Sequence, residues 1–149
     1  MILGLVLRHA VCPWTSFMKV EHHRDLEVWQ LADEIRRVIF ELTSRPEVKK
    51  DFEFCDQSRR AARSACRNFA EGFWRYAHPE FARFVLIARG SLGELFDSGD
   101  EALQRQYFDR SEYDALNSLL QRAIAAATSL HAYLASTPTP PAQRRRRVE

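Results

Sequence analysis

Residues 57–75 read Gln-Ser-Arg-Arg-Ala-Ala-Arg-Ser-Ala-Cys-Arg-Asn-Phe-Ala-Glu-Gly-Phe-Trp-Arg. Apolar residues in and just before this stretch recur at helical spacing, and most are small: Cys55, Ala62, Ala65, Cys66, Phe69 and Phe73. This period predicts an amphipathic helix over residues 52–74. Small side chains on its buried side let a neighbouring helix approach closely, so the stretch predicts a packed helical bundle.

Three further segments, residues 25–44, 79–104 and 109–135, have an apolar period near 3.6 residues. The segments are joined by short loops, and no strand pattern competes with them. In the first segment, polar residues including Asp33 fall on the side opposite the apolar stripe. We therefore expect Asp33 to face solvent.

Local signals mark the ends of these helices. Asp25 is a good N-cap residue, and Pro46 disfavours helical geometry in the residue before it. Pro79 suits the first turn of a helix, where its missing N–H costs nothing. Asp109 and Glu112 form a capping-box pattern.

Glycines interrupt two of the predicted helices. Gly72 is a weak point near the end of its helix, because glycine costs backbone entropy there. Gly90, Gly93 and Gly99 lie inside the third helix, and each lowers helix propensity by about 1 kcal/mol relative to Ala. Tertiary packing must compensate, so we expect these glycines to permit close helix contact.

The chain has 149 residues, 46% of them hydrophobic, with only 5 Gly and 6 Pro. These values predict one all-α domain, an antiparallel up-down-up-down four-helix bundle over residues 23–135. We expect a poorly ordered N-terminal extension over residues 1–22 and a disordered Pro/Arg-rich tail over residues 136–149. Met18 is a second candidate translation start.

The formal net charge of +2 is unevenly distributed. Residues 136–149 carry +3, so residues 1–135 carry −1. Any nucleic-acid signal in the bundle must therefore come from the arrangement of its charges. Only 3 of the 22 basic residues are lysines. Because the arginines are spread over the whole chain, codon bias in a GC-rich genome explains this better than phosphate binding.

The cysteines and the hydropathy indicate a cytoplasmic protein. Cys12, Cys55 and Cys66 show no metal-ligand spacing, and the last two read as small buried hydrophobes. Unpaired thiols fit a reducing compartment. No apolar run is long enough to span a membrane, and the apolar residues 2–7 lack the features of a signal peptide.

Catalytic and metal-binding patterns are missing from the sequence. Di-iron bundles need Glu-x-x-His motifs, and no helical acid here is followed three residues later by His. His22 and His23 are a weak ligand pair and read as flexible and solvated. There is no Gly-x-Ser-x-Gly elbow and no phosphate loop, while Ser64 and Ser91 lie within helices, where back-bonding to the chain is expected. We expect a non-enzymatic protein with no metal and no cofactor.

The candidate functional residues are four arginines on the helix over residues 52–74: Arg59, Arg60, Arg63 and Arg67. The last three share one helix face, and Arg59 lies beside it. One interpretation is a phosphate-binding ridge with Trp74 and Tyr76 near its end for stacking. The other, which we favour, is structural: Arg59 or Arg60 pairs with Glu94, and the rest form a solvated face.

Two further groups of polar residues need an account. The run of Arg144, Arg145, Arg146 and Arg147 reads equally well as a nucleic-acid arm or as a solubilising tail. Asn68 and Glu71 share a helix face and are costly to bury unpaired. We expect them to belong, with Gln57 and Glu94, to a satisfied structural or interface network.

Several motifs are similar to those of a known family: Asp25-Leu26-Glu27-Val28-Trp29-Gln30, Gln57-x-Arg59-Arg60-Ala61-Ala62, Asn68-x-Ala70-Glu71-Gly72, Phe81-x-Arg83-Phe84 and Ile87-Ala88-Arg89-Gly90-Ser91-Leu92-x-Glu94-Leu95. Across residues 22–135 the chain resembles the bacterial four helix bundle protein family, also called the large-subunit ribosomal-RNA intervening-sequence protein family. The resemblance implies a ring-shaped homopentamer. A similar pentameric bundle, the accessory variability protein of diversity-generating retroelements, binds nucleic acid and a reverse transcriptase.

The sequence departs from the family pattern in its basic residues. After Ala62 the family usually carries Val-Ser-Ile-Pro, whereas Arg63, Ser64, Ala65 and Cys66 stand here, followed by Arg67 at a position that is usually small. The resemblance thus assigns Arg59 and Arg60 to the shared framework and leaves Arg63 and Arg67 as additions. We expect an oligomeric scaffold that binds RNA or DNA electrostatically, or alternatively a protein-interaction module with no nucleic-acid role.

Overall fold

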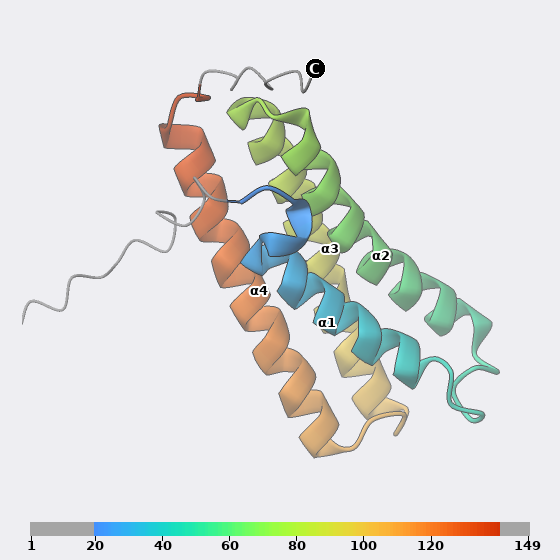
Figure 1. Cartoon of the computed structure of the whole chain (residues 1–149). Coiled ribbons are helices and arrows are strands. Elements are labelled where there is room, and N and C mark those ends of the chain that lie inside the picture. The colour runs from blue at the N-terminus through green and yellow to red at the C-terminus, as the bar shows by residue number, and fades with distance from the viewer. Residues whose placement is uncertain (1–19, 141–149) are drawn as a thin grey trace, which may run out of the picture.

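The structure, a computed structural model, describes residues 20–140, and all the elements in this part of the chain are helical (Figure 1). A short 3-10 helix precedes four long α-helices: η2 (His23–Asp25), α1 (Glu27–Leu42), α2 (Phe52–Arg75), α3 (His78–Gln104) and α4 (Arg110–Ser136). The expected all-α class is confirmed. Most of the expected N-terminal extension and the Arg144–Arg147 run lie outside the described residues.

The four long helices lie side by side and alternate in direction along the chain (Figure 1). Only residues 76–77 separate α2 from α3, so these two helices form a tight antiparallel pair. The α2–α3 packing is the most extensive in the bundle, and α1 packs less extensively against α2. The less extensive packing between α1 and α2 is where the groove described below lies.

The start of the first helix differs from the prediction. Asp25 belongs to η2, where its carboxylate accepts a hydrogen bond of 3.0 Å from the backbone N–H of His22. Leu26 is then the N-cap of α1, without a side-chain cap bond. The sequence signal at Asp25 was a true capping signal, but it acts on the 3-10 turn that precedes the helix.

The predicted capping box of α4 is confirmed. The Asp109 carboxylate accepts from the N–H of Glu112 at 2.8 Å, and Glu112 accepts in return from the N–H of Asp109 at 3.0 Å. Arg45, after α1, donates to the same Glu112 carboxylate at 2.5 Å. The hydrogen bonds from Arg45 and Asp109 lower the pKa of Glu112, so the box also links the end of α1 to the start of α4.

The apolar stripes form the core as predicted, except that Asp33 is buried, with 4% of its surface exposed. Its carboxylate accepts hydrogen bonds from Arg36 and is 2.7 Å from a guanidinium nitrogen of Arg37. Burial favours a higher pKa for Asp33, but the hydrogen bonds and charges of the two arginines outweigh it and lower the pKa. The expectation that Asp33 faces solvent was wrong, because these arginines compensate its charge.

The helical glycines serve different purposes. A Cβ at Gly72 would lie 2.5 Å from the Phe81 ring and 2.8 Å from the Cβ of Phe84, so glycine is required where α3 crosses α2. A Cβ at Gly99 would meet the Leu116 side chain at 3.4 Å. At Gly90 and Gly93 no described atom outside the adjacent backbone of α3 lies within 4 Å of such a Cβ, so the expected close helix contact is wrong for these two within the described chain.

Candidate nucleic-acid interface

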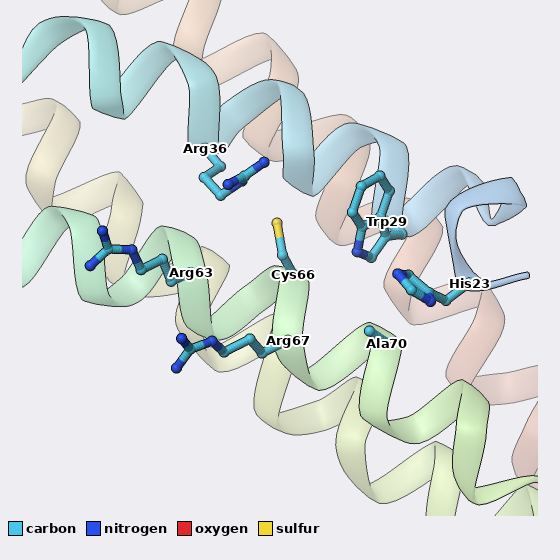
Figure 2. Close-up of a pocket in the computed structure, with 7 residues that line it drawn as sticks. All are labelled: His23, Trp29, Arg36, Arg63, Cys66, Arg67 and Ala70. Carbon is cyan, nitrogen blue, oxygen red and sulfur yellow. The ribbon is translucent and has the colours of Figure 1, made fainter.

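A groove with a cavity of about 320 Å³ lies between α1 and α2. Its walls come from η2, α1 and α2, as Figure 2 shows, and consist of His23, Trp29, Arg36, Arg63, Cys66, Arg67 and Ala70. The lining combines three arginines with two aromatic rings. We call this feature the α1–α2 groove.

Arg63 and Arg67 come from successive turns of α2, and their side chains extend in the same direction along it (Figure 2). Both also line a second hollow of about 350 Å³ on the other side, together with Arg60, Asn68 and Glu71. The two arginines therefore form a ridge between two concave surfaces. Two adjacent guanidinium groups in this position are accessible to an anion from either side.

Neither ridge arginine has a carboxylate within salt-bridge distance among residues 20–140. The guanidinium carbon of Arg63 lies 4.8 Å from the ring centroid of Phe40, which leaves its N–H donors available. Arg67 is exposed. Both groups thus carry positive charge that no residue in the described chain neutralises at close range.

The other two candidate arginines have partners. Arg59 donates to the hydroxyl of Thr43 at 2.8 Å and to its carbonyl at 3.1 Å, which connects α2 to the end of α1. Arg60 lies 3.1 Å from the Asp56 carboxylate, one turn earlier on α2. Neither pairs with Glu94, so that expectation was wrong, because nearer partners were available to both side chains.

The floor of the groove is electrostatically compensated and chemically inert. Arg36 is held by the buried carboxylate of Asp33. Cys66 points its sulfur toward α1 beneath Arg36, and burial raises the pKa of this thiol to about 11 (Figure 2). Cys66 therefore stays protonated near neutral pH and acts as a small hydrophobe, as its sequence context predicted.

One end of the groove is closed by a cluster of rings that the sequence did not predict. The indole N–H of Trp74 donates to Nδ1 of His23 at 2.9 Å, and the His23 ring meets Trp29 edge-on with centroids 5.3 Å apart. An indole can only donate, so Nδ1 of His23 is unprotonated. Burial, assisted by the charges of His22 and Arg24, lowers the pKa of His23 and favours the neutral ring.

The expectation of a flexible, solvated histidine pair was therefore wrong. His22 stacks obliquely on His23, with ring centroids 4.2 Å apart, and meets Trp74 edge-on at 5.4 Å. The distance in sequence between η2 and the end of α2 hid this contact. The signal that was available is the unusual density of aromatic and imidazole rings in the two segments.

Tyr76 does not join this ring cluster. Its hydroxyl donates to the carbonyl of Pro140 at 2.7 Å, and the N–H of His78 donates to the Thr139 hydroxyl at 2.9 Å. The chain after α4 is thereby anchored to the turn between α2 and α3. Arg144 follows Pro140 by four residues in the sequence, and the basic run lies outside the described residues.

The expected polar network is only partly assembled. The Asn68 amide donates to the carbonyl and the hydroxyl of Ser64, and Ser91 on α3 donates to the same hydroxyl at 2.7 Å. Gln57 and Glu71 instead bond within α2, Gln57 to Glu53 and Glu71 to Arg75. Glu94 is exposed on α3 and lies outside this network. The cross-helix contribution of the two serines was missed, because helical serines usually bond to their own backbone.

The comparison with known families agrees with this architecture. The family model of the 23S rRNA-intervening sequence protein matches residues 24–129. The chain belongs to this family. The match covers α1, α2, α3, most of α4 and all but the first residue of η2, which confirms the resemblance drawn from the motifs. No curated protein matches the chain.

Two further observations bear on the chemistry of this family member. Within residues 20–140, no three His, Cys, Asp or Glu side chains are grouped closely enough to hold a metal ion. None of the described helices is long and apolar enough to cross a membrane.

Proposed function

We propose that the protein is a non-enzymatic, oligomeric helical bundle that binds RNA or DNA electrostatically in the cytoplasm. The observation that carries this proposal is the ridge of Arg63 and Arg67, whose charges no described residue neutralises at close range. Planar guanidinium groups are well suited to phosphate oxygens. Arg60 lines the same surface, whereas Arg59 serves the bundle itself.

The basic run Arg144–Arg147 contributes to the same binding surface in this proposal. Pro140 is fixed beside the α2–α3 turn, and four residues of extended chain reach about 14 Å. Because the bundle outside the tail carries a net charge of −1, binding depends on this local concentration of arginines. Such binding weakens steeply as salt rises.

The proposal includes assembly as a ring-shaped homopentamer through the outward face of α3. Leu86 and Ile87 on this face are 46% and 43% exposed, and Gly90 and Gly93 follow on the next turns with open space beside them. The two glycines cost helix propensity and gain no packing within one chain. A second copy packed closely against them would supply that gain, as would the burial of the two aliphatic side chains.

A titration of labelled RNA and DNA at several salt concentrations tests the nucleic-acid proposal. Exchanging Arg63→Glu and Arg67→Glu together should weaken binding at low salt by roughly 100-fold, since each charge-assisted contact contributes about tenfold. The matched control exchanges Arg110→Glu and Arg122→Glu on α4, which alters the net charge equally. Absence of binding by the unmodified protein at low salt, or equal weakening by both pairs, would contradict the proposal.

A second candidate function, a protein-interaction scaffold without a nucleic-acid role, is favoured by the exposed apolar side chains. Besides Leu86 and Ile87, Phe52 at the start of α2 is 82% exposed. This candidate predicts a defined protein partner that survives nuclease treatment and is lost on exchanging Leu86→Glu and Ile87→Glu. Native mass spectrometry of the same variant separates loss of a foreign partner from loss of self-assembly.

A further inference from the structure

We infer that the α1–α2 groove receives one unpaired base of a single-stranded nucleic acid, seated against His23 and Trp29 with its neighbouring phosphates on Arg63 and Arg67. The inference rests on the proposed function and specifies the state of the strand. It follows from the combination, in one place, of a cavity, ring walls and two arginines that have no described carboxylate within salt-bridge distance.

The cavity has the size and lining of a site for a flat aromatic group. Its volume of about 320 Å³ lies at the lower end of the range for small-ligand pockets. Trp29 and His23 supply ring surfaces on one side of the groove. On the α2 side, the small Ala70 side chain leaves room for a flat ring. Rings of this kind stack on any base, because every base has a π-face.

Polar groups around the cavity match the edge of a base. With Nδ1 of His23 occupied by the Trp74 indole, the ring proton is on Nε2, which is a donor. The Arg36 guanidinium is oriented by Asp33 and points toward Trp29 in Figure 2, and its side chain is 40% exposed. The walls thus offer N–H donors to the carbonyl and ring-nitrogen acceptors that bases carry.

The negative charges near the groove are compensated, so an anionic strand meets no repulsion from isolated carboxylates. Asp33 is shared by Arg36 and Arg37. Glu71, on the outer side of the ridge, is paired with Arg75 at 2.7 Å. The charge that remains at the rim is the positive charge of Arg63 and Arg67.

The geometry favours a single strand over a duplex. In a duplex each base is paired and stacked, so it reaches a pocket only after extrusion, which costs free energy. An unpaired base enters the groove without that cost while its phosphates contact the ridge. A duplex is limited to the ridge arginines and to the basic run.

The test compares a labelled single strand with a blunt duplex of the same sequence by fluorescence anisotropy at low salt. The single strand should bind about tenfold more tightly, as expected for one stacked base. In a Trp14→Phe background, the emission of Trp29 and Trp74 should be quenched by the single strand and not by the duplex. Equal affinities with unchanged emission would overturn the inference and leave electrostatic binding intact.

Two variants locate the effect in the groove without removing a ridge arginine. Ala70→Leu fills the cavity, and His23→Ala removes one ring and its N–H donor. Each should reduce single-strand affinity to the duplex level while duplex affinity stays unchanged. The control Ala135→Leu on exposed α4 surface should keep the preference, and circular dichroism confirms folding of each variant.

The outcomes separate the two proposals. Retention of the single-strand preference by both folded variants would overturn the assignment to the groove. Failure of either strand to bind the unmodified protein at low salt would overturn the proposed function together with this inference. Loss of the preference in both variants, with duplex binding preserved, is the result that supports both.

Discussion

The two sides of α2 differ in how they meet their neighbours. Toward α3 the helix presents Gly72, against which the Phe81 ring packs so closely that a Cβ has no room. Toward α1 it presents Arg63, Cys66 and Arg67, and a groove remains open. One helix, α2, is thus closely packed against α3 and leaves an accessible groove toward α1. We call the closely packed α2–α3 contact the seam.

This contrast shows how the bundle stays packed although the α1–α2 groove is open. The contact between α2 and α3 buries apolar surface continuously and includes few polar contacts, among them the Ser64–Ser91 and Ser58–Ser98 hydrogen bonds. Hydrogen bonds connect α2 to the ends of α1. Arg59 donates to Thr43 at the C-terminal end of α1, and Trp74 donates to His23 just before its N-terminal end. Between these two contacts, Arg63 and Arg67 have no described carboxylate within salt-bridge distance.

The largest effect on stability is expected from adding a side chain at Gly72, where α2 and α3 are in contact. Gly72→Ala should lower the free energy of unfolding by about 3 kcal/mol, because a fully buried phenylalanine ring must move. Gly90→Ala is the matched control: its Cβ meets open space, so it should raise helix propensity without a clash. Urea unfolding of both variants measures the difference. Equal stabilities would show that the seam is not tightly packed.

A smaller loss of folding free energy is expected from removing the contact between Arg59 and Thr43 at the C-terminal end of α1. Arg59→Ala removes hydrogen bonds to the buried Thr43 and should cost about 2 kcal/mol of folding free energy. Arg67→Ala, on the open side, should change stability by less than about 0.5 kcal/mol. For nucleic-acid affinity the order should be reversed: Arg67→Ala should lower the affinity more than Arg59→Ala. Similar stability losses for both variants would remove the distinction between framework and ridge arginines.

The smallest effect concerns the ring cluster and its response to pH. The folded chain lowers the pKa of His23, so below the ordinary value of 6.5 the unfolded chain binds more protons than the folded one. The free energy of unfolding should therefore fall as the pH drops from about 6.5 through the lowered pKa, and then level off. His23→Gln should flatten this dependence in unfolding titrations. An unchanged pH profile in His23→Gln would place the titration elsewhere.

The sequence predicted most of the fold, because the helices are long and their ends carry local signals. The capping box at Asp109 and the apolar stripe of α2 needed only neighbouring residues to be recognised. The burial of Asp33 could not be predicted in this way, since it depends on how α1 is oriented against α2. The signal in hindsight was the pair of arginines three and four residues later.

The arrangement of the candidate site was predicted only in part. The comparison of Arg63 and Arg67 with the family pattern pointed to two of the four arginines, and the structure leaves these two without close carboxylate partners in the described chain. The ring cluster was missed because His23 and Trp74 are 51 residues apart. The partner of Arg59 was missed because Thr43 is 16 residues away, at the end of a different helix, and the sequence does not show how the two helices are aligned.

Photocrosslinking of a bromouracil-substituted single strand, followed by mass spectrometry of the crosslinked peptides, identifies the residues that contact the bases and so tests binding in the α1–α2 groove. We expect crosslinks to the rings at the end of the α1–α2 groove, His23, Trp29 and Trp74, and we expect these crosslinks to be lost in the Arg63→Glu, Arg67→Glu double variant. Crosslinks confined to α3, α4 or the residues after Pro140 would contradict it.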